Sequence, residues 1–482
     1  MSDQRLAAGL FLAALLARTV SWMGLGLFGP DSANFLTMAD WMGEGRFQDA
    51  LAMAYHPLFP LLIAVVKPLA GGAVPAGHAV SIVLGAAATI PLFCIAREMF
   101  GRPSALLAGL IYALHPRMVD VQSDVMTEAT FMFFFLSAMW LTWRMGEEPT
   151  ADRGVVLALS ASAAFLTRAE GILVILLAVA WPAAQAVRNR CADPARWGAV
   201  LLTPVVVVLA LAPYLFWVKA ERGHWAMSVR PSLISAERAV GIQLGPDDRE
   251  DTVFGASKLY KNYAQSIIRL SLHGALIPFY ILGLAQLRKA GLRRSLWYLA
   301  FTGGLLGGVL LTLRQHNAMS DRYLMVGMAL LGAAAAAGMV SAQGILARKW
   351  PDARWRPALT LAAVILIVVA PAFRWLHVRR TEERSYVHAA AWFRSQEKRP
   401  SVISGTAQVA YLAGSRPILL PLTRDQALRQ VRELGVECFV FDDRDAASLP
   451  EVSMLRSSDF LFPPVRIAGS PGTIPVYVQF VK

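Results

Sequence analysis

The sequence predicts a mainly α-helical, polytopic membrane protein with about 11 transmembrane helices and a small C-terminal α/β domain outside the cytoplasm. Composition is the first observation behind this prediction, because 56% of the 482 residues are hydrophobic and only 16% are charged. A soluble domain has about 25% charged residues. The apolar fraction therefore excludes an ordinary cytosolic enzyme, a secreted disulfide scaffold and a disordered regulator.

Apolar segments are the second observation. A span is expected at each of residues 6–28, 80–95, 104–114, 129–143, 155–166, 172–186, 200–217, 264–287, 296–313, 324–343 and 358–373. The segment PLFPLLIAVVKPLAGG is too short to cross a hydrocarbon core that needs about 20 apolar residues, so we expect an interfacial helix there. The N-terminal apolar run lacks a convincing cleavage site, which favours a retained span over a signal peptide.

The distribution of arginine and lysine predicts the orientation, because these residues concentrate in cytoplasmic loops. A single helix over 154–187 would put Arg188, Arg190 and Arg196 outside, so the segment TRAEG is expected to turn between two short spans. Every arginine-rich loop and the N-terminus then face the cytoplasm. The net charge of +13 reflects this topology, and no nucleic-acid partner is expected. The outer loops are residues 29–79, 115–128, 219–262 and 314–322.

The change in composition near residue 374 is the third observation. Helices are expected in YVHAAAWFRSQE, TAQVAYLAG and TRDQALRQVRELG, and strands in SVIS, ECFVFDD and PVYVQFV. We therefore divide the chain into a transmembrane domain, 1–376, and a periplasmic α/β domain, 377–482. The three cysteines are far apart and indicate neither a disulfide framework nor a metal site.

Acidic side chains at the outer ends of the spans are candidates for chemistry, since the spans themselves carry few charges. Asp31 follows the first span, where a carboxylate can act as a general base or simply cap a helix. Asp120, Asp124 and Glu128 follow at intervals of four residues, a spacing that puts side chains on one face of a helix. Glu128 adjoins the apolar run FMFFFLSAMW, where it is either functional or a helix-start acid.

Basic side chains also gather on the outer side. Arg168 lies in the turn TRAEG, where it either faces a phosphate or pairs locally with Glu170. A second group suits the head group of a phospholipid-like substrate, the alternative being an ordinary charged turn: Arg314, His316, Asp321 and Arg322. His56 is either a metal ligand or a helix-start residue. One histidine with scattered acids identifies no metal ligands, and a divalent metal stays an option.

Five segments, in this order and on one side of the membrane, resemble the outer loops of the GT-C membrane glycosyltransferases. They are PDSANFLTMADWM, YHPLFPLLI, HPRMVDVQSDVMTEATF, LTRAEG and SDRYLM. The nearest branch is the bacterial one that is similar to dolichyl-phosphate-mannose protein mannosyltransferases and the lipid A aminoarabinose transferase. The segments VAYLAG and LGVECFVFDD resemble the C-terminal domain of that family, so the resemblance covers nearly the whole chain.

The resemblance implies a GT-C fold and carries site residues over by motif. Asp31 matches the catalytic Asp of the first loop, and Glu128 matches the second acidic position, with Asp124 as its rival. Many members have another acid directly after the first-loop Asp, whereas Ser32 follows Asp31 here, which argues against a paired-carboxylate or metal-bridged site. Arg322 and Tyr323 match the Arg-Tyr pair of the family near the donor phosphate. Arg168 and Arg314 are further candidate ligands of that phosphate, from their position alone. Contacts to the sugar or acceptor are expected among His56, Trp41, Tyr55 and His316.

The implied activity is transfer of a monosaccharide, with inversion, from a polyprenyl-phosphate donor to a glycan, lipid or protein acceptor. The chain is expected in the bacterial inner membrane, with the N-terminus in the cytoplasm and the C-terminal domain in the periplasm. Three alternatives stay open: a transporter or flippase of lipid-linked sugars, an oligosaccharide ligase with a pyrophosphate-linked donor, and a scaffold whose working part is the tail. A transporter is expected to have internal repeats, and the sequence shows none.

Overall fold

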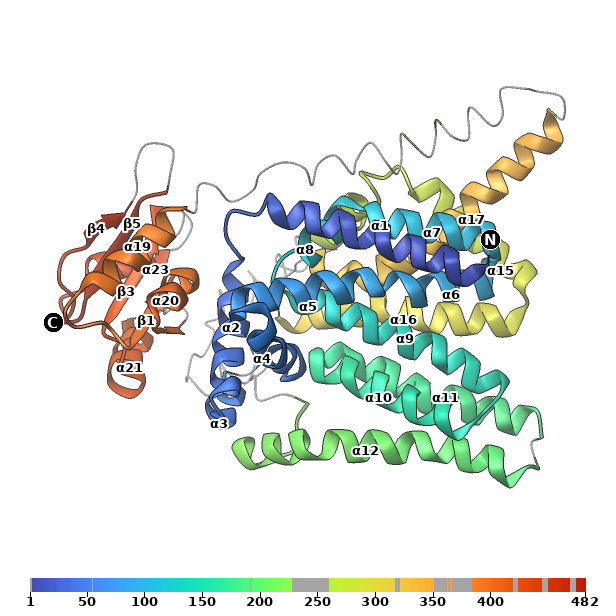
Figure 1. Cartoon of the computed structure of the whole chain (residues 1–482), viewed down its shortest axis with the longest axis horizontal. Coiled ribbons are helices and arrows are strands. Elements are labelled where there is room, and N and C mark those ends of the chain that lie inside the picture. Colours follow the sequence, from blue (N-terminus) through green and yellow to red (C-terminus); the bar gives the residue numbers. More distant parts are fainter. Residues whose placement is uncertain are drawn as a thin grey trace, which may run out of the picture.

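The chain forms a long helical bundle with a small mixed α/β domain at one end (Figure 1). The structure is a computed structural model that describes residues 2–53, 55–190, 192–227, 260–316, 321–350, 384–418, 424–443, 450–468 and 474–482, together with Ala362 and Ile365. The boundary predicted at 376/377 lies outside these residues.

The first helices form the end of the bundle that faces the small domain. The helix α1 (Asp3–Met23) runs along the bundle and begins at Ser2, whose side chain accepts a hydrogen bond from the N–H of Arg5. After α1 the chain turns, and α2 (Pro30–Gly43) crosses the end of the bundle (Figure 1). The short helix α3 (Phe47–Ala52) follows, and α4 (Leu58–Ala70) occupies the segment for which an interfacial helix was predicted.

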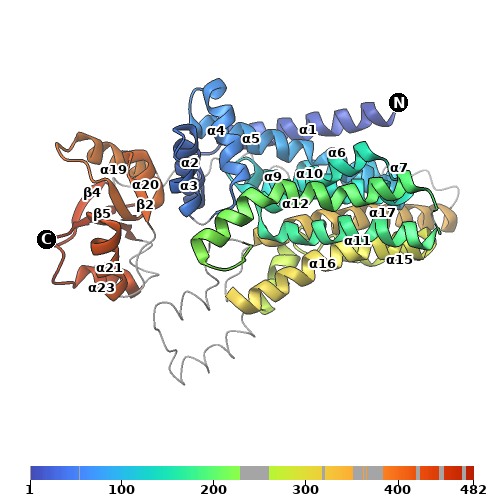
Figure 2. The same cartoon turned by 90° about the horizontal axis from the view of Figure 1, so that it is seen from below.

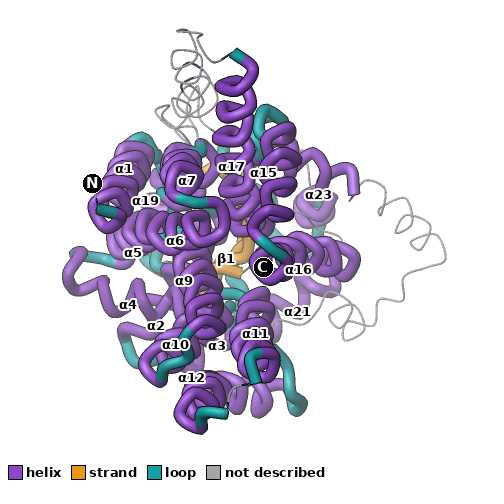
Figure 3. Tube along the Cα trace, turned by 90° about the vertical axis from the view of Figure 1, so that its right-hand side faces the viewer, coloured by secondary structure: helices purple, strands orange, loops and turns teal. Residues whose placement is uncertain are grey.

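The remaining bundle helices mostly run between its two ends. They are α5 (Ala73–Ala87), α6 (Thr89–Phe100), α7 (Arg102–Leu114), α8 (Pro116–Gln122), α9 (Thr127–Glu147), α10 (Ala151–Thr167), α11 (Ile172–Arg188), α12 (Pro194–Arg222), α15 (Ile277–Ala290), α16 (Leu292–His316) and α17 (Met325–Lys349). Viewed end-on, α9 lies near the middle and packs against α5, α6, α10 and α11 (Figure 3). This position buries most of the apolar run that follows Glu128.

Within the described residues, five helices are long and apolar enough to cross a membrane, and a bent pair would make a sixth. The five are Asp3–Met23, Ala73–Phe100, Ala169–Arg188, Pro194–Arg222 and Asp321–Lys349. The first ten predicted spans coincide with helical segments, and the eleventh, 358–373, lies almost wholly outside the described residues. A mainly helical, multi-pass membrane protein is therefore confirmed, whereas the count of 11 stays a prediction.

The bent pair corrects one expectation about the acids of the second outer loop. The helices α8 and α9 meet at an angle of 112°. Asp124 lies in the break between them, because α8 ends at Gln122 and α9 begins at Thr127. Asp124 and Glu128 therefore do not share a helix face, and the four-residue spacing predicted the wrong relationship between them.

The C-terminal region contains a five-stranded sheet in the order β2-β1-β3-β5-β4. Strands β1 (Val402–Gly405), β2 (Arg416–Ile418) and β3 (Cys438–Asp442) are parallel, whereas β4 (Val465–Ala468) and β5 (Val476–Phe480) join as antiparallel strands. The predicted strands SVIS, ECFVFDD and PVYVQFV correspond to β1, β3 and β5, while β2 and β4 were not predicted. Gly405 has φ +129, and a Cβ there would lie 1.7 Å from the Val440 carbonyl oxygen, so only glycine fits this crossing.

Helices α19 (Arg384–Ser395), α20 (Ala407–Ala413), α21 (Arg424–Leu434) and α23 (Pro450–Arg456) pack with this sheet. The predicted ends of α20 and α21 at Gly414 and Gly435 are confirmed, since both glycines have left-handed φ values of +81 and +67. The helix α20 packs on α2, and Figures 1 and 2 show α2 between the small domain and the bundle. The small domain thus contacts the helix that carries Asp31.

Candidate functional site

The first turn of α2 holds Asp31 at the end of the bundle near the small domain. Gly29 is the N-cap residue and Pro30 the first helical residue, a combination that fixes the start of the helix. Asp31 therefore lies in the first turn and is not the capping residue. Its side chain is 43% exposed, so a soluble group can reach its carboxylate.

Arg322 is the ion-pair partner of Asp31. It lies in the 3₁₀ turn η2 (Asp321–Leu324), directly before α17. Its Nη2 atom donates a hydrogen bond of 2.7 Å to Oδ2 of Asp31, and its Nε atom lies 3.8 Å from Oε1 of Glu128. One guanidinium thus contacts carboxylates from two different helices, α2 and α9.

Glu128 lies in the first turn of α9 and is buried beside a second guanidinium. Its Oε1 atom accepts a hydrogen bond of 3.2 Å from Nη1 of Arg168. Arg168 also donates a 2.7 Å bond to Oε1 of Glu170 in the 3₁₀ turn η1 (Ala169–Gly171). Glu128 is only 3% exposed, so its charge depends on these two arginines.

Arg168 is held by opposite charges and by an aromatic ring. Burial opposes its positive charge, but the carboxylates of Glu170 and Glu128 outweigh burial and raise the pKa of Arg168. Its guanidinium also lies 5.2 Å from the ring centre of Tyr323. We call the five charged residues that these contacts join the ion-pair cluster: Asp31, Glu128, Arg168, Glu170 and Arg322.

Asp124, the rival of Glu128, contacts the backbone at the start of α2. Its two carboxylate oxygens lie 3.2 and 3.1 Å from the N–H of Gly29. It also accepts hydrogen bonds from the N–H of Val125 at 2.8 Å and from the hydroxyl of Ser32 at 3.4 Å. Asp124 therefore anchors the N-terminus of α2 on the break between α8 and α9, where the helix dipole and the carboxylate attract each other.

His56 lies beside the cluster but packs as an aromatic ring. Its ring centre lies 5.5 Å from that of Phe165 and 5.7 Å from that of Tyr214. Burial lowers the pKa of His56 to about 4, and the nearby charges of Glu170 and Arg168 act in opposite directions. The imidazole is therefore neutral at pH 7.

The aromatic candidates lie on two surfaces. Trp41 faces the small domain, with the guanidinium of Arg416 5.7 Å from its ring and that of Arg46 4.9 Å away. Tyr55 packs edge-on against Phe35 and accepts a hydrogen bond from the amide of Asn34. Their roles toward sugar or acceptor stay predictions. Two further candidates lie at the end of α16, and their side chains are outside the described part of the structure: Arg314 and His316.

Three contacts of this region were missed or understated by sequence reasoning. Glu170 was expected only as a local partner of Arg168, but it belongs to the same chain of contacts as Glu128. Ser32 stands where the resemblance expects a second acid, and its hydroxyl donates to Asp124. The Asp40–Tyr411 hydrogen bond had no sequence signal, because it joins residues 371 positions apart. Across the described residues, no group of three histidine, cysteine, aspartate or glutamate side chains is placed to hold a metal ion.

Comparison with known proteins shows which family and which fold the chain is similar to. Residues 55–217 match the family model described as dolichyl-phosphate-mannose-protein mannosyltransferase. The fold is similar to that of ArnT from Cupriavidus metallidurans bound to undecaprenyl phosphate, with a TM-score of 0.65 and 13% identity over 99% of this chain and 98% of that chain. The chain resembles the GT-C membrane glycosyltransferases. This confirms the resemblance stated from the sequence motifs.

Two further structures share this fold. ArnT from Cupriavidus metallidurans in the apo state matches with a TM-score of 0.60 and 14% identity over 99% of this chain and 98% of that chain. The oligosaccharyltransferase AglB from Archaeoglobus fulgidus, in complex with an inhibitory peptide and a dolichol-phosphate, has a TM-score of 0.54 and 12% identity over 91% and 70% of the two chains. No curated protein sequence matches the chain significantly.

Proposed function

We propose that the chain is a glycosyltransferase that moves a monosaccharide from a polyprenyl-phosphate donor to an acceptor, with inversion, at the periplasmic or external face of the bacterial inner membrane. One observation carries the proposal: charged residues from four separate segments converge in ion pairs at one end of the bundle, the ion-pair cluster. Such a cluster offers carboxylates for proton transfer beside guanidinium groups for a phosphate.

In the proposed reaction the acceptor oxygen forms a bond to the anomeric carbon while the bond from that carbon to the phosphate oxygen breaks. The acceptor proton passes to the half-exposed carboxylate of Asp31, which acts as general base. The polyprenyl phosphate leaves with an additional negative charge, which Arg322 and Arg168 stabilise. The anomeric carbon has oxocarbenium character in the transition state, as in glycosidases.

Donor binding requires a rearrangement of charge in the cluster. Both guanidinium groups are paired with carboxylates in the structure, so a phosphate would compete with Asp31 for Arg322. Loss of that pairing frees the carboxylate of Asp31 to accept the proton of the acceptor. The support for this step is the single 2.7 Å contact between these two residues.

The test is donor binding and donor consumption by the purified full-length chain in nanodiscs. Polyprenyl phosphate itself is titrated first, because its binding does not depend on knowing the acceptor. We expect saturable binding. We then expect one member of a panel of polyprenyl-phosphate monosaccharides to lose its sugar, which mass spectrometry detects. Absence of polyprenyl-phosphate binding would contradict the proposal.

An oligosaccharide ligase is the second candidate, supported by the fold shared with the AglB oligosaccharyltransferase. The same binding assay with polyprenyl pyrophosphate and an oligosaccharide-loaded pyrophosphate donor separates the two. Preference for the monophosphate supports the monosaccharide transferase. Consumption of the pyrophosphate donor alone would establish the ligase instead.

A further inference from the structure

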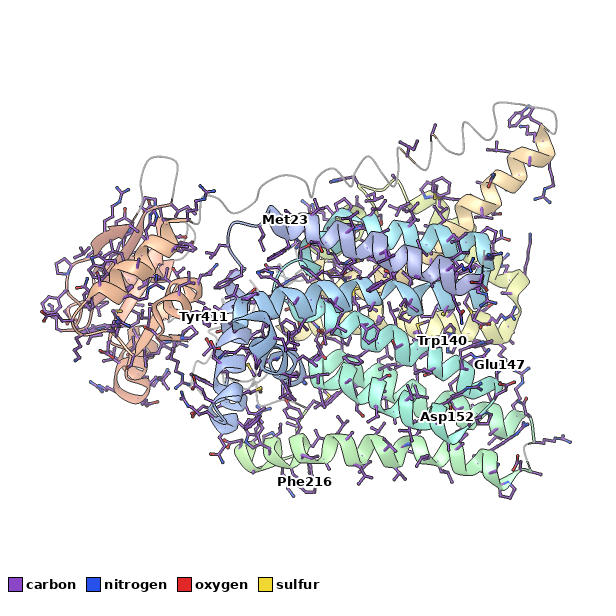
Figure 4. All side chains as sticks on the ribbon, in the orientation of Figure 1. Met23, Trp140, Glu147, Asp152, Phe216 and Tyr411 are labelled. Carbon is purple, nitrogen blue, oxygen red and sulfur yellow. The ribbon has the colours of Figure 1, made fainter. Side chains whose placement is uncertain are left out.

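Arg18 is a fully buried cation on α1, the first helix that is long and apolar enough to cross a membrane. It lies five residues before α1 ends at Met23, which Figure 4 labels at the end of the helix nearest the small domain. Among the residues that the structure describes, no carboxylate pairs with Arg18. A buried charge without a counter-charge is strongly unfavourable, so its presence indicates a task beyond filling space.

The three side-chain nitrogens of Arg18 all donate hydrogen bonds. Nε and Nη2 donate to Oε1 of Gln122, at 2.9 and 2.6 Å. Nη1 donates to the carbonyl oxygens of Ala14, at 2.9 Å, and Ala113, at 3.4 Å. The guanidinium also lies 5.1 Å from the ring centre of Tyr112. Because its donors are engaged and its surface is buried, Arg18 does not touch a substrate, and any role in the reaction acts through Gln122.

Gln122 is the last residue of α8, at the bend of 112° into α9. The segment from Gln122 to Thr127 contains neither proline nor glycine, so it has no local cause for a bend of this size. Contacts from other helices hold the bend instead. The hydroxyl of Ser123 lies 3.1 Å from the carbonyl oxygen of Arg18, and Nδ1 of His78 on α5 lies 2.8 Å from the carbonyl oxygen of Ser123. Arg18 thus contacts the bend with its side chain and with its backbone.

The bend in turn holds the start of α2. Asp124 lies two residues beyond Gln122, and its carboxylate oxygens are 3.2 and 3.1 Å from the N–H of Gly29, the N-cap residue of α2. Asp31 follows in the first turn of that helix. A continuous path of contacts therefore leads from Arg18, through Gln122 and Asp124, to the helix that carries the proposed general base.

We propose that Arg18 is a positioning residue for the transfer reaction, which fixes the bend between α8 and α9 through Gln122 and thereby the position of Asp31. Its effect on turnover rests on the proposed function, whereas its effect on the structure does not. Arg18 supplies geometry and no proton or charge to the reacting atoms, because all of its nitrogens already donate within the protein.

Two substitutions disturb this contact in different ways. Arg18→Met removes the donors and keeps an unbranched side chain in their place. Gly85→Ala on α5 leaves both partners present, but a Cβ at Gly85 would lie 2.9 Å from Oε1 of Gln122 and 3.1 Å from Nε of Arg18, so the amide group has to move. Gly9→Ala on α1 is the matched control, because a Cβ at Gly9 meets no described atom within 4 Å. Gln122→Glu is the conservative variant, since a carboxylate accepts the same two hydrogen bonds.

Hydrogen exchange followed by mass spectrometry, on the full-length chain in nanodiscs, measures the positioning itself. In Arg18→Met and Gly85→Ala we expect amide exchange to rise at least about tenfold in segments 119–127 and 28–32, the effect of a lost hydrogen bond to a charged group. Gly9→Ala and Gln122→Glu should exchange as the wild type does. Wild-type exchange of segment 28–32 in both disruptive variants, or an equal rise over the whole bundle, would overturn the proposal.

Kinetics separate positioning from donor binding. In Arg18→Met and Gly85→Ala we expect turnover to fall at least about tenfold, because a small displacement of a general base slows the reaction, while the affinity for polyprenyl phosphate stays within about twofold. The affinity is retained because Arg168 and Arg322 belong to other segments of the chain. Gln122→Glu should keep the turnover of the wild type.

Two results have separate meanings. If affinity for polyprenyl phosphate falls in step with turnover, Arg18 supports the whole site and does not position Asp31, and the proposal is wrong. If the wild type consumes no donor, the proposed function is wrong, and the exchange experiment alone decides whether Arg18 holds the bend and the start of α2.

Discussion

The Nη2 atom of Arg322 lies 2.7 Å from Oδ2 of Asp31, although the two residues are 291 positions apart. The segment before α17 thereby meets the first turn of α2. Arg322 also lies near Glu128, and Glu128 in turn pairs with Arg168 from the turn between α10 and α11. The pair therefore connects the exposed carboxylate of Asp31 to the buried part of the ion-pair cluster.

The first prediction concerns Asp31 as general base. Asp31→Asn keeps the shape of the side chain but cannot accept the acceptor proton, so we expect transfer to fall at least about 100-fold. Polyprenyl-phosphate binding should be retained or strengthened, because Arg322 loses its competing carboxylate. The turnover rate and the affinity for polyprenyl phosphate are measured in the same preparation and compared with those of the wild type.

Asp49→Asn is the control for this variant. Asp49 lies nearby on α3, is about half exposed and pairs only with Arg46 among the described residues. It should transfer sugar at the wild-type rate. Full activity of a folded Asp31→Asn protein would remove Asp31 from the proposed mechanism.

The second prediction concerns the buried charge of Glu128. Glu128→Gln removes a carboxylate beside two arginines, and we expect a loss of about 2 kcal/mol in stability together with weaker turnover. Thermal melts in detergent measure the first effect. Glu44→Gln removes an exposed partner of Arg46 instead and should shift the melt far less, because such pairs contribute about 0–1 kcal/mol. Equal melts for the two variants would show that the network around Glu128 is not stabilising.

The third prediction separates Asp124 from the acids of the cluster. Asp124→Asn weakens the contacts to Gly29 and Ser32, so α2 should be held less firmly at its N-terminus, at a cost of about 1–3 kcal/mol. Activity should fall only in proportion to the folded fraction. Loss of all turnover in a fully folded Asp124→Asn protein would instead make Asp124 the second functional acid.

The sequence predicted most of the fold because membrane spans and helix ends leave local signals. Apolar runs marked ten helical segments, and Gly414 and Gly435 marked two helix ends. The short strands β2 and β4 were missed because three or four residues show no useful alternation of apolar and polar side chains. The bend between α8 and α9 was missed because nothing between Gln122 and Thr127 is a proline or glycine.

The candidate site was predictable as a set of outer-loop charges but not as a set of contacts. The predicted topology placed Asp31, Glu128 and Arg322 on the same side of the membrane, and the structure has them at one end of the bundle. Which carboxylate meets which guanidinium depends on tertiary packing, so the role of Asp124 at the start of α2 could not be predicted. The catalytic and binding roles of these residues stay predictions.

The fourth prediction concerns pH and His56. The folded protein holds the pKa of His56 at about 4, below the value of about 6.5 in an unfolded chain. Between these values the unfolded state binds more protons, so stability falls as pH falls from 6.5 towards 4. His56→Gln should reduce this loss between pH 7 and pH 5. Part of the loss of stability should remain in this variant, because burial also lowers the pKa of His115 to about 4. Identical melting curves of wild type and His56→Gln at both pH values would contradict the assignment.

The fifth prediction concerns the contact of the small domain with α2. Figure 4 shows Tyr411 on the side of the small domain that faces the bundle. Its hydroxyl donates a 3.1 Å hydrogen bond to Asp40, which Lys67 also contacts at 2.6 Å, and its ring packs edge-on against Phe28. Burial and the neighbouring Asp40 raise the pKa of Tyr411, so the hydroxyl stays protonated and the bond persists into alkaline solution.

Tyr411→Phe removes only this bond, and we expect a stability loss of about 1 kcal/mol. Because α2 carries both Asp40 and Asp31, turnover should fall while the affinity for polyprenyl phosphate stays unchanged. Tyr477→Phe is the control, since Tyr477 packs against Phe441 within the small domain. If the two variants lose turnover equally, the small domain acts through its own stability and the contact with α2 does not position Asp31.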